Sequence, residues 1–198
     1  MLRSLALAAA LALAGAAASA QQLSLGEISG YLNGRRSAQG GFTQVNADGT
    51  ITTGTVYIKR PGRVRFEYAP PDRSLFVAGG GQVAVFDPRS NTGPERFPLN
   101  QTPLSIILAD NVDLNRSGMV TNHVSDGTST IVTAQDPEHP DYGSIQMVFT
   151  ASPVELRQWI VTDETGSQTT VILNDLQEGV RIGERPFNIE AEVQAWEG

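Results

Sequence analysis

The residues best equipped for binding chemistry are three arginines in one short stretch. In YIKRPGRVRFEY, residues 57–68, Arg60, Arg63 and Arg65 stand within six positions of one another. Guanidinium groups bind phosphates, carboxylates and backbone carbonyls, so the run could hold a polyanion or form fixed hydrogen bonds inside the protein. Apolar residues at alternate positions and a Pro-Gly pair in the middle predict two β-strands joined by a tight turn.

Alternation along these strands separates Arg60 from the other two arginines. Arg60 has the same parity as Val56 and Ile58, so it continues an apolar row. Arg63 and Arg65 have the opposite parity to the apolar residues around them, which predicts a solvated outer face. A guanidinium on an apolar face needs acceptors, and the carbonyl ends of a short helix could supply them. Alternatively, the turn lets Arg60 reach water, and the residues alone leave both possibilities open.

A second cluster could suggest a metal site or a catalytic centre. In DPEHPDY, residues 136–142, Asp136, Glu138, His139 and Asp141 stand close together. Acidic residues flanked by prolines are more typical of an exposed turn. The only other histidine is His123, no serine-nucleophile motif is present, and there is no cysteine. We therefore expect no catalytic residue, no metal and no cofactor, and we predict that the protein is not an enzyme.

The first twenty residues predict the compartment. MLRSLALAAALALAGAAASA has one positive charge, an apolar run and a small-x-small ending, which is typical of a secretory signal peptide cleaved after Ala20. Residues 21–198 are expected to form a single domain with its own core. The net charge of −7 argues against binding of nucleic acid or of an anionic membrane surface. We expect an exported, soluble monomer in the periplasm.

Short extended runs separated by turn residues dominate the rest of the chain. A capping box at Ser24 and Glu27 predicts one helix near residue 25, and Thr102 followed by Pro103 predicts a second, short helix. About ten strands follow the period-2 pattern, and RPFNIEAEV near the end could add another. Beyond the first hairpin, they cover residues 63–68, 74–78, 82–87, 95–99, 119–125, 128–135, 144–150, 155–163 and 168–174. The pattern predicts an antiparallel barrel or a strongly curved sheet.

The segment GTVYIKRPGRVRFEYAPPDRSLFVAGGGQVAVFDP resembles the signature of the bacterial outer-membrane lipoprotein carrier family, the LolA type. The matching residues are Gly54, Val56, Ile58, Arg60, Pro61, Phe66, Tyr68, Pro71, Gly80, Phe86, Asp87 and Pro88. YLNGRRSAQGGFTQ resembles the first helix and strand of that family. LRQWIVTDETGSQTTVILNDLQEG resembles its late hairpin.

The resemblance implies a mainly β fold, an incomplete, half-open antiparallel β-barrel with short α-helices forming a lid over an apolar cavity. It implies a periplasmic carrier of acylated lipoproteins, supplied by an inner-membrane lipoprotein-releasing ABC transporter and emptied by an outer-membrane lipoprotein receptor of the LolB type. Arg60 would be the latch that holds the lid closed. Val64 matches a family position concerned with handing cargo on, and it is smaller than the aromatic residue often found there.

An acyl-chain cavity needs an apolar lining, because each methylene moved out of water is worth about 0.8 kcal/mol. The residues expected to line it are Phe42, Val56, Ile58, Val64, Phe66, Tyr68, Phe76, Phe86, Ile107, Leu108, Met147, Phe149, Trp159 and Val161. The interior of any barrel of this size has the same composition, so the pattern does not distinguish a cavity from a packed core. The alternative function is a periplasmic protein of the same fold that binds a lipid or glycolipid, or that senses lipoproteins and regulates a membrane signalling protein.

Overall fold

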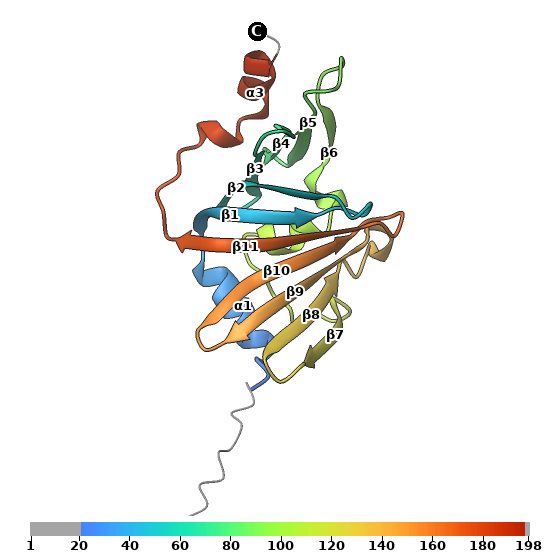
Figure 1. Cartoon of the computed structure of the whole chain (residues 1–198). Coiled ribbons are helices and arrows are strands. Elements are labelled where there is room, and N and C mark those ends of the chain that lie inside the picture. The colour runs from blue at the N-terminus through green and yellow to red at the C-terminus, as the bar shows by residue number, and fades with distance from the viewer. Residues whose placement is uncertain (1–20, 197–198) are drawn as a thin grey trace, which may run out of the picture.

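The computed structural model describes residues 21–196, so the predicted signal peptide and its cleavage after Ala20 lie outside the described residues. Eleven strands form one antiparallel sheet in the order β6-β5-β4-β3-β2-β1-β11-β10-β9-β8-β7 (Figure 1). Each half of the chain forms a meander of hairpins, and the pairing of β1 with β11 joins the halves. Within residues 21–196, β6 and β7 end the sheet without pairing to each other, so it curls strongly but does not close.

The strands follow the segments that the period-2 pattern predicted. Their bounds are β1 Ser37–Val45, β2 Ile51–Lys59, β3 Arg63–Tyr68, β4 Leu75–Gly79, β5 Gln82–Phe86, β6 Glu95–Pro98, β7 Val120–Ser125, β8 Ser129–Gln135, β9 Ser144–Ala151, β10 Val154–Thr162 and β11 Gln168–Glu178. The predicted mainly β, incomplete antiparallel barrel is confirmed.

One glycine shows how tightly the sheet curves. A Cβ on Gly54 in β2 would come within 2.7 Å of the Phe42 ring and would collide with the backbone of Glu67. Because glycine has no side chain, β2 can pass this close to β3 while the ring of Phe42 fills the inside of the bend.

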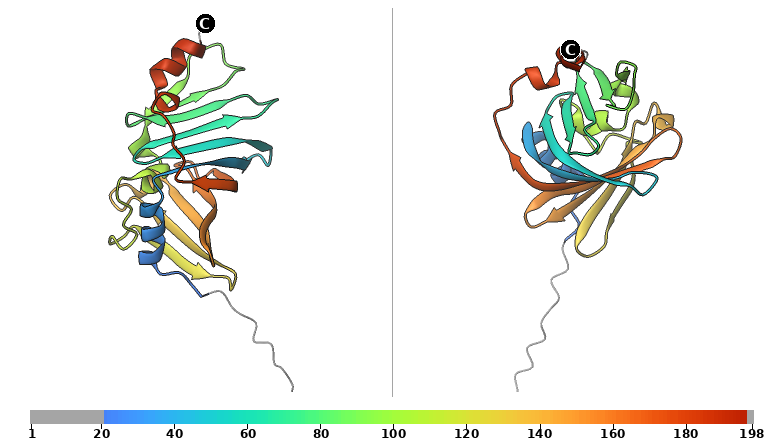
Figure 2. Two further views of the ribbon diagram at one scale, coloured as in Figure 1. Left: turned by 90° about the vertical axis from the view of Figure 1, so that its left-hand side faces the viewer. Right: turned by 45° about the horizontal axis from the view of Figure 1, so that its top comes forward.

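Two helices lie against the concave side of the sheet. They are α1 Leu25–Gly34 and α2 Leu104–Leu108, the latter preceded by the 3-10 helix η1 Leu99–Gln101. Figure 2 shows both inside the curl of the sheet. Ser24 caps α1 through the predicted capping box. Thr102 does not cap α2 as predicted, because its hydroxyl donates instead to the carbonyl of Leu99 at 2.8 Å.

The C-terminal segment is helical, so the predicted final strand is wrong. It forms the 3-10 helix η3 Arg185–Phe187 and α3 Ile189–Trp196, while a further 3-10 helix, η2 Pro140–Tyr142, lies in the proline-rich turn. The apolar residues of α3 pack onto the convex face of β4 and β5. Ile189 and Val193 stand four positions apart, so a helix places both on the face that packs against the sheet.

The same segment changes the surroundings of the outer arginines. Arg65 was predicted to be solvated, yet only 12% of its side chain is exposed. It pairs with Glu67 at 2.6 Å and with Glu192 of α3 at 3.0 Å. Arg63 pairs with Glu184. The prediction of a solvated outer face fails here because the C-terminal segment covers this part of the sheet.

Candidate functional site

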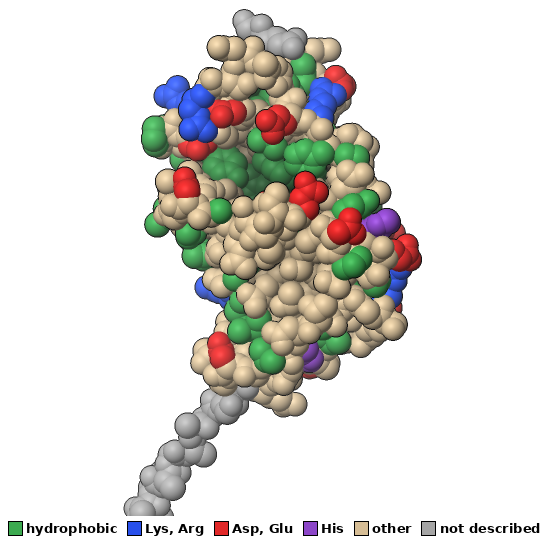
Figure 3. Space-filling view, turned by 90° about the vertical axis from the view of Figure 1, so that its right-hand side faces the viewer, with side chains coloured by type: hydrophobic (Ala, Val, Ile, Leu, Met, Phe, Trp, Pro, Cys, Tyr) green, Lys and Arg blue, Asp and Glu red, His purple; other side chains and the backbone are tan. Residues whose placement is uncertain are grey.

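A cavity of about 600 Å³ opens at one end of the concave face. Figure 3 shows it as a hollow with hydrophobic side chains at its floor and acidic side chains close to its edge. Its lining comprises Gln44, Phe66, Tyr68, Phe76, Phe97, Gln101, Thr102, Pro103, Leu104, Tyr142, Trp159, Val161, Asp163, Glu164, Thr165, Ser167, Thr169 and Val171. We call this the open hollow. A space of this size is within the range of ligand pockets, roughly 300–1,000 Å³.

Connected aromatic rings form one wall of the open hollow. Phe66 makes edge-to-face contacts with Phe76 at 5.7 Å and with Trp159 at 6.3 Å between ring centroids. Phe42 lies behind, in edge-to-face contact with Phe66 and Tyr68, both at 5.1 Å. Each such contact adds about 0.5–1.5 kcal/mol to the burial of the rings, so the wall is held in one arrangement.

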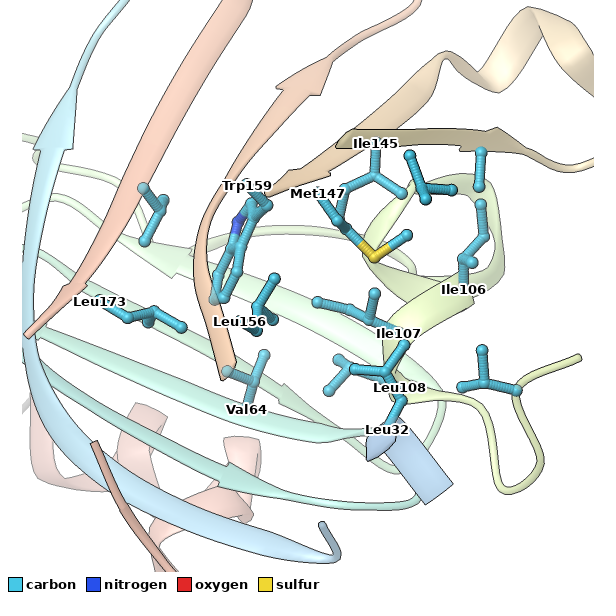
Figure 4. Close-up of a cluster of buried hydrophobic side chains, with 14 of the residues drawn as sticks. Leu32, Val64, Ile106, Ile107, Leu108, Ile145, Met147, Leu156, Trp159 and Leu173 are labelled. Atoms are coloured by element: carbon cyan, nitrogen blue, oxygen red, sulfur yellow. The ribbon is translucent and has the colours of Figure 1, made fainter. Parts of the chain in front are cut away.

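The deeper interior is filled by the protein's own side chains. Figure 4 shows Ile107 and Leu108 of α2 pointing toward Met147, Leu156 and Val64 of the sheet. All five are buried, and they belong to one continuous core cluster. We call this region the closed interior, and we call α1 and α2 together with residues 109–114 the lid.

The structure divides the predicted lining residues into three groups. Phe66, Tyr68, Phe76, Trp159 and Val161 line the open hollow. Phe42, Val56, Val64, Ile107, Leu108, Met147 and Phe149 are buried in the closed interior, and Ile58 packs against them half-buried.

Phe86 belongs to neither region, and its prediction as a lining residue is corrected. It lies on the convex face with Leu75, Val77 and Ala84, beneath Ile189 of α3. In β5, Val83 and Val85 contact the inner core, so Phe86 has the wrong parity to point inward.

Arg60 projects from the end of β2 into the lid and is 6% exposed. Its guanidinium donates to the carbonyls of Leu32, in the last turn of α1, and of Ala109, directly after α2. It also donates to Oδ1 of Asn33 at 3.1 Å. Both carbonyls stand at helix C-termini, which carry partial negative charge, so the cation is well placed electrostatically. One side chain thus ties the ends of both lid helices to the sheet.

Two polar side chains of α1 add further bonds within the lid. Asn33 accepts from the backbone N–H of Val112 at 2.8 Å and donates to its carbonyl at 2.9 Å. The Ser29 hydroxyl accepts from the N–H of Leu114 at 3.1 Å. These bonds satisfy backbone groups of Val112 and Leu114, which lie outside the strands, and make α1 and this segment one unit.

The ionisation of the site follows from burial and hydrogen bonding. Burial lowers the pKa of the Arg60 guanidinium, which still remains charged at neutral pH. Burial raises the pKa of Tyr68 to about 12, and its hydroxyl donates to Oε1 of Gln44 at 2.8 Å. At the rim, the hydrogen bond from the Thr165 hydroxyl lowers the pKa of Asp163. The open hollow therefore has an apolar wall, neutral polar groups and at least one anionic rim residue.

Sequence reasoning missed the rim of the open hollow. The tip of the β10–β11 hairpin, residues 163–167, and residues 101–104 before and within α2 line it. Neither stretch has a local signal for a cavity, because both are polar turns or helix starts. Val171 also lines the open hollow, and for this residue the alternation along β11 does give a signal, because it places the side chain inward.

The acidic turn at residues 136–142 is held by ordinary surface contacts. His139 stacks on Tyr142 with 4.7 Å between ring centroids, and Glu138 pairs with Arg116 at 2.7 Å. Within residues 21–196, no group of three or more His, Asp or Glu side chains is close enough to hold a metal ion. In the same part of the chain, no helix is long and apolar enough to cross a membrane.

Comparison with known proteins adds an independent finding. The family described as "Outer membrane lipoprotein carrier protein LolA" matches residues 33–190. An outer-membrane lipoprotein carrier protein of Cupriavidus necator is 26% identical over 181 residues, covering 85% of this chain and 84% of the relative. One of Pseudomonas aeruginosa is 24% identical over 196 residues, covering 94% and 90%. A crystal structure of a LolA superfamily protein from Nitrosomonas europaea superimposes with a TM-score of 0.40, at 13% identity over 84% of this chain and 98% of that chain.

Proposed function

This chain belongs to the LolA family of outer membrane lipoprotein carrier proteins, and from that membership we propose how it carries its cargo. The members of this family are carriers and not enzymes. In our proposal, the chain takes acylated lipoproteins at the inner membrane, holds their acyl chains on the concave face of the sheet, and delivers them through the periplasm to an outer-membrane receptor. An ATP-driven lipoprotein-releasing complex and an anchored receptor are the proposed partners.

The single observation that carries the proposal is the bonding of Arg60 to both lid helices above an apolar interior. A packed core needs no buried cation at its edge, because a guanidinium is costly to remove from water. A closure that must open does benefit from a buried cation, because its hydrogen bonds to the lid can be replaced by hydrogen bonds to water when the lid opens. We propose that Arg60 is the latch of the lid.

Exchange of apolar groups makes a reversible carrier physically reasonable. When the lid moves, Ile107, Leu108 and Leu32 leave contacts with the sheet, and acyl methylenes take their places. Exposing apolar area of the lid costs free energy at about 25 cal/mol per Å². This cost offsets part of the free energy that is gained when the acyl chains are buried. The net affinity is then far below that of the acyl chains for a rigid empty cavity, so a receptor can remove them.

The test is depletion of the protein in its native host, followed by location of the outer-membrane lipoproteins. We expect them to accumulate at the inner membrane, and we expect the unaltered chain to restore their transport. A chain with Arg60→Leu should bind cargo but release it poorly. Mass spectrometry of organic extracts of the purified protein identifies what is bound. Correctly located lipoproteins after depletion, or a free lipid as the bound species, would reject the carrier proposal.

A further inference from the structure

We propose that the open hollow is a preformed site for one acyl chain, filled while the lid is still closed, and that only further chains require the lid to open. This inference rests on the proposed carrier function and divides its binding site in two. The first compartment is the open hollow at the end of the sheet. The second is the closed interior beneath α1 and α2.

The size of the open hollow fits one chain and not several. A methylene group occupies about as much room as a water molecule, which takes up about 30 Å³ in the liquid. A cavity of about 600 Å³ therefore holds on the order of 20 such groups. That is the length of one ordinary fatty acyl chain, whereas a di- or triacyl lipopeptide carries two or three.

The wall of the open hollow explains why it stays open without cargo. Phe66, Phe76 and Trp159 are locked edge to face, and each ring is large and stiff. Behind them, Phe42 supports Phe66 and Tyr68. Rings fixed in this way cannot collapse into the space as flexible leucine side chains can.

Helix α2 forms the boundary between the two compartments. Leu104 at its first position lines the open hollow, while Ile107 and Leu108 one turn later are buried in the closed interior. Trp159 stands at the same boundary from the side of the sheet, since it lines the hollow and also belongs to the core cluster. A second chain can pass beyond this boundary only by displacing side chains of the lid.

Trp159 provides the reporter for a binding experiment. The chain has two tryptophans, and Trp196 lies on the convex face beside Phe86. Substituting Trp196→Phe leaves Trp159 as the sole tryptophan, so fluorescence excited selectively in tryptophan comes from the compartment boundary. A fatty acid brominated near the middle of its chain is the single-chain probe, and a synthetic triacyl lipopeptide with brominated chains is the multi-chain probe. Both probes quench Trp159 when they occupy the open hollow.

A disulfide can hold the lid closed in the same protein. The backbone N–H of Gly62, in the turn between β2 and β3, donates to the carbonyl of Leu108 at the end of α2 at 2.8 Å, so Gly62→Cys with Leu108→Cys joins α2 to the sheet. The natural chain has no cysteine, so this pair has no competitor. The reduced protein is the matched control for the oxidised one. A second lock, Leu23→Cys with Thr130→Cys, joins the segment before α1 to β8, where the N–H of Leu23 donates to the Thr130 hydroxyl at 2.9 Å, and it serves the same test if the first variant does not fold.

The expected result separates the two probes. The fatty acid should bind one to one, with affinities that agree within about twofold between oxidised and reduced protein, because its site exists with the lid closed. The lipopeptide should lose on the order of tenfold or more in affinity when the protein is oxidised. The inference is overturned if oxidation abolishes fatty acid binding, or if the lipopeptide binds equally well to both forms. If neither probe binds the reduced protein, the carrier function itself is rejected.

Discussion

Removing the Arg60 guanidinium is the most direct test of the latch. Arg60→Leu leaves a shorter, apolar side chain at the end of β2 and deletes the bonds to Leu32, Asn33 and Ala109. Hydrogen bonds to a charged group contribute about 1.5–3 kcal/mol each. The cost of keeping the guanidinium out of water opposes this gain, and it also lowers the pKa of Arg60. We therefore count only two bonds, at the lower value.

This count makes the closed lid about 3 kcal/mol less stable in Arg60→Leu, and each 1.4 kcal/mol is a factor of ten. The lid should thus open roughly 100-fold more often. Cargo that needs an open lid should bind more tightly by up to the same factor, because less of the protein is held in the competing closed state. It should be released correspondingly more slowly, which blocks delivery.

Hydrogen–deuterium exchange of residues 25–34 and 104–114 measures the opening, and the transfer of a labelled triacyl lipopeptide to acceptor vesicles measures release. The matched control is Arg36→Leu, which removes a charge beside the same lid. Arg36 pairs with Asp110 at 2.6 Å, but more than half of its side chain is exposed, so the pair is worth at most about 1 kcal/mol. If the two variants change exchange and release equally little, Arg60 is not a latch.

Three further predictions concern the two faces of the sheet and the rim. Phe86→Ala should lower the free energy of unfolding by about 3–5 kcal/mol in urea titrations. The affinity for a fatty acid should stay unchanged, because Phe86 lies on the convex face. Weaker fatty acid binding would show instead that Phe86 contributes to the cavity. Because burial raises the pKa of Tyr68 to about 12, its neutral form stabilises the fold below the unfolded pKa of about 10, and this contribution is lost as the pH rises from 10 to 12. Melting temperatures should therefore fall less over this range in Tyr68→Phe, and equal slopes would contradict the assignment. Asp163→Asn with Glu164→Gln should raise the affinity for a fatty acid anion about twofold at low salt, since the rim carboxylates repel anions. The affinity for a neutral monoacylglycerol should stay unchanged. An equal effect on both ligands would exclude this electrostatic explanation.

Much of the concave face could be predicted from residue order. Side chains alternate along a strand, so Val64, Phe66 and Tyr68 had to share one face, and the structure places all three inward. The capping box at Ser24 positioned α1 for the same local reason. Arg60 stood out as a charged side chain in an apolar row, but the residues alone left open whether it bonds to helix carbonyls or reaches water, and the structure decides for the carbonyls.

Contacts between distant segments account for the predictions that failed. Residues 185–193 form helices because an apolar face on the convex side of β4 and β5 is available to them, and no local pattern reveals that face. The same contact buries Arg65 and covers Phe86, whose outward orientation itself follows from its parity with Val83 and Val85 in β5. Local propensity is weak for short segments, so such packing determines their structure.

The amino-acid sequence by itself determined the β-rich class, the hairpins and the orientation of most strand residues, because these depend on alternation and turn residues only a few positions apart. The tertiary structure alone decided which part of the apolar interior is hollow and which is filled. Phe76 and Phe149 are equally apolar and both point inward, yet Phe76 is half-buried and lines the open hollow while Phe149 is completely buried. The difference lies in what stands opposite each ring, because the lid packs over one part of the concave face and leaves the other uncovered. The reach of the lid depends on contacts between segments far apart in the chain, and no short-range pattern encodes them.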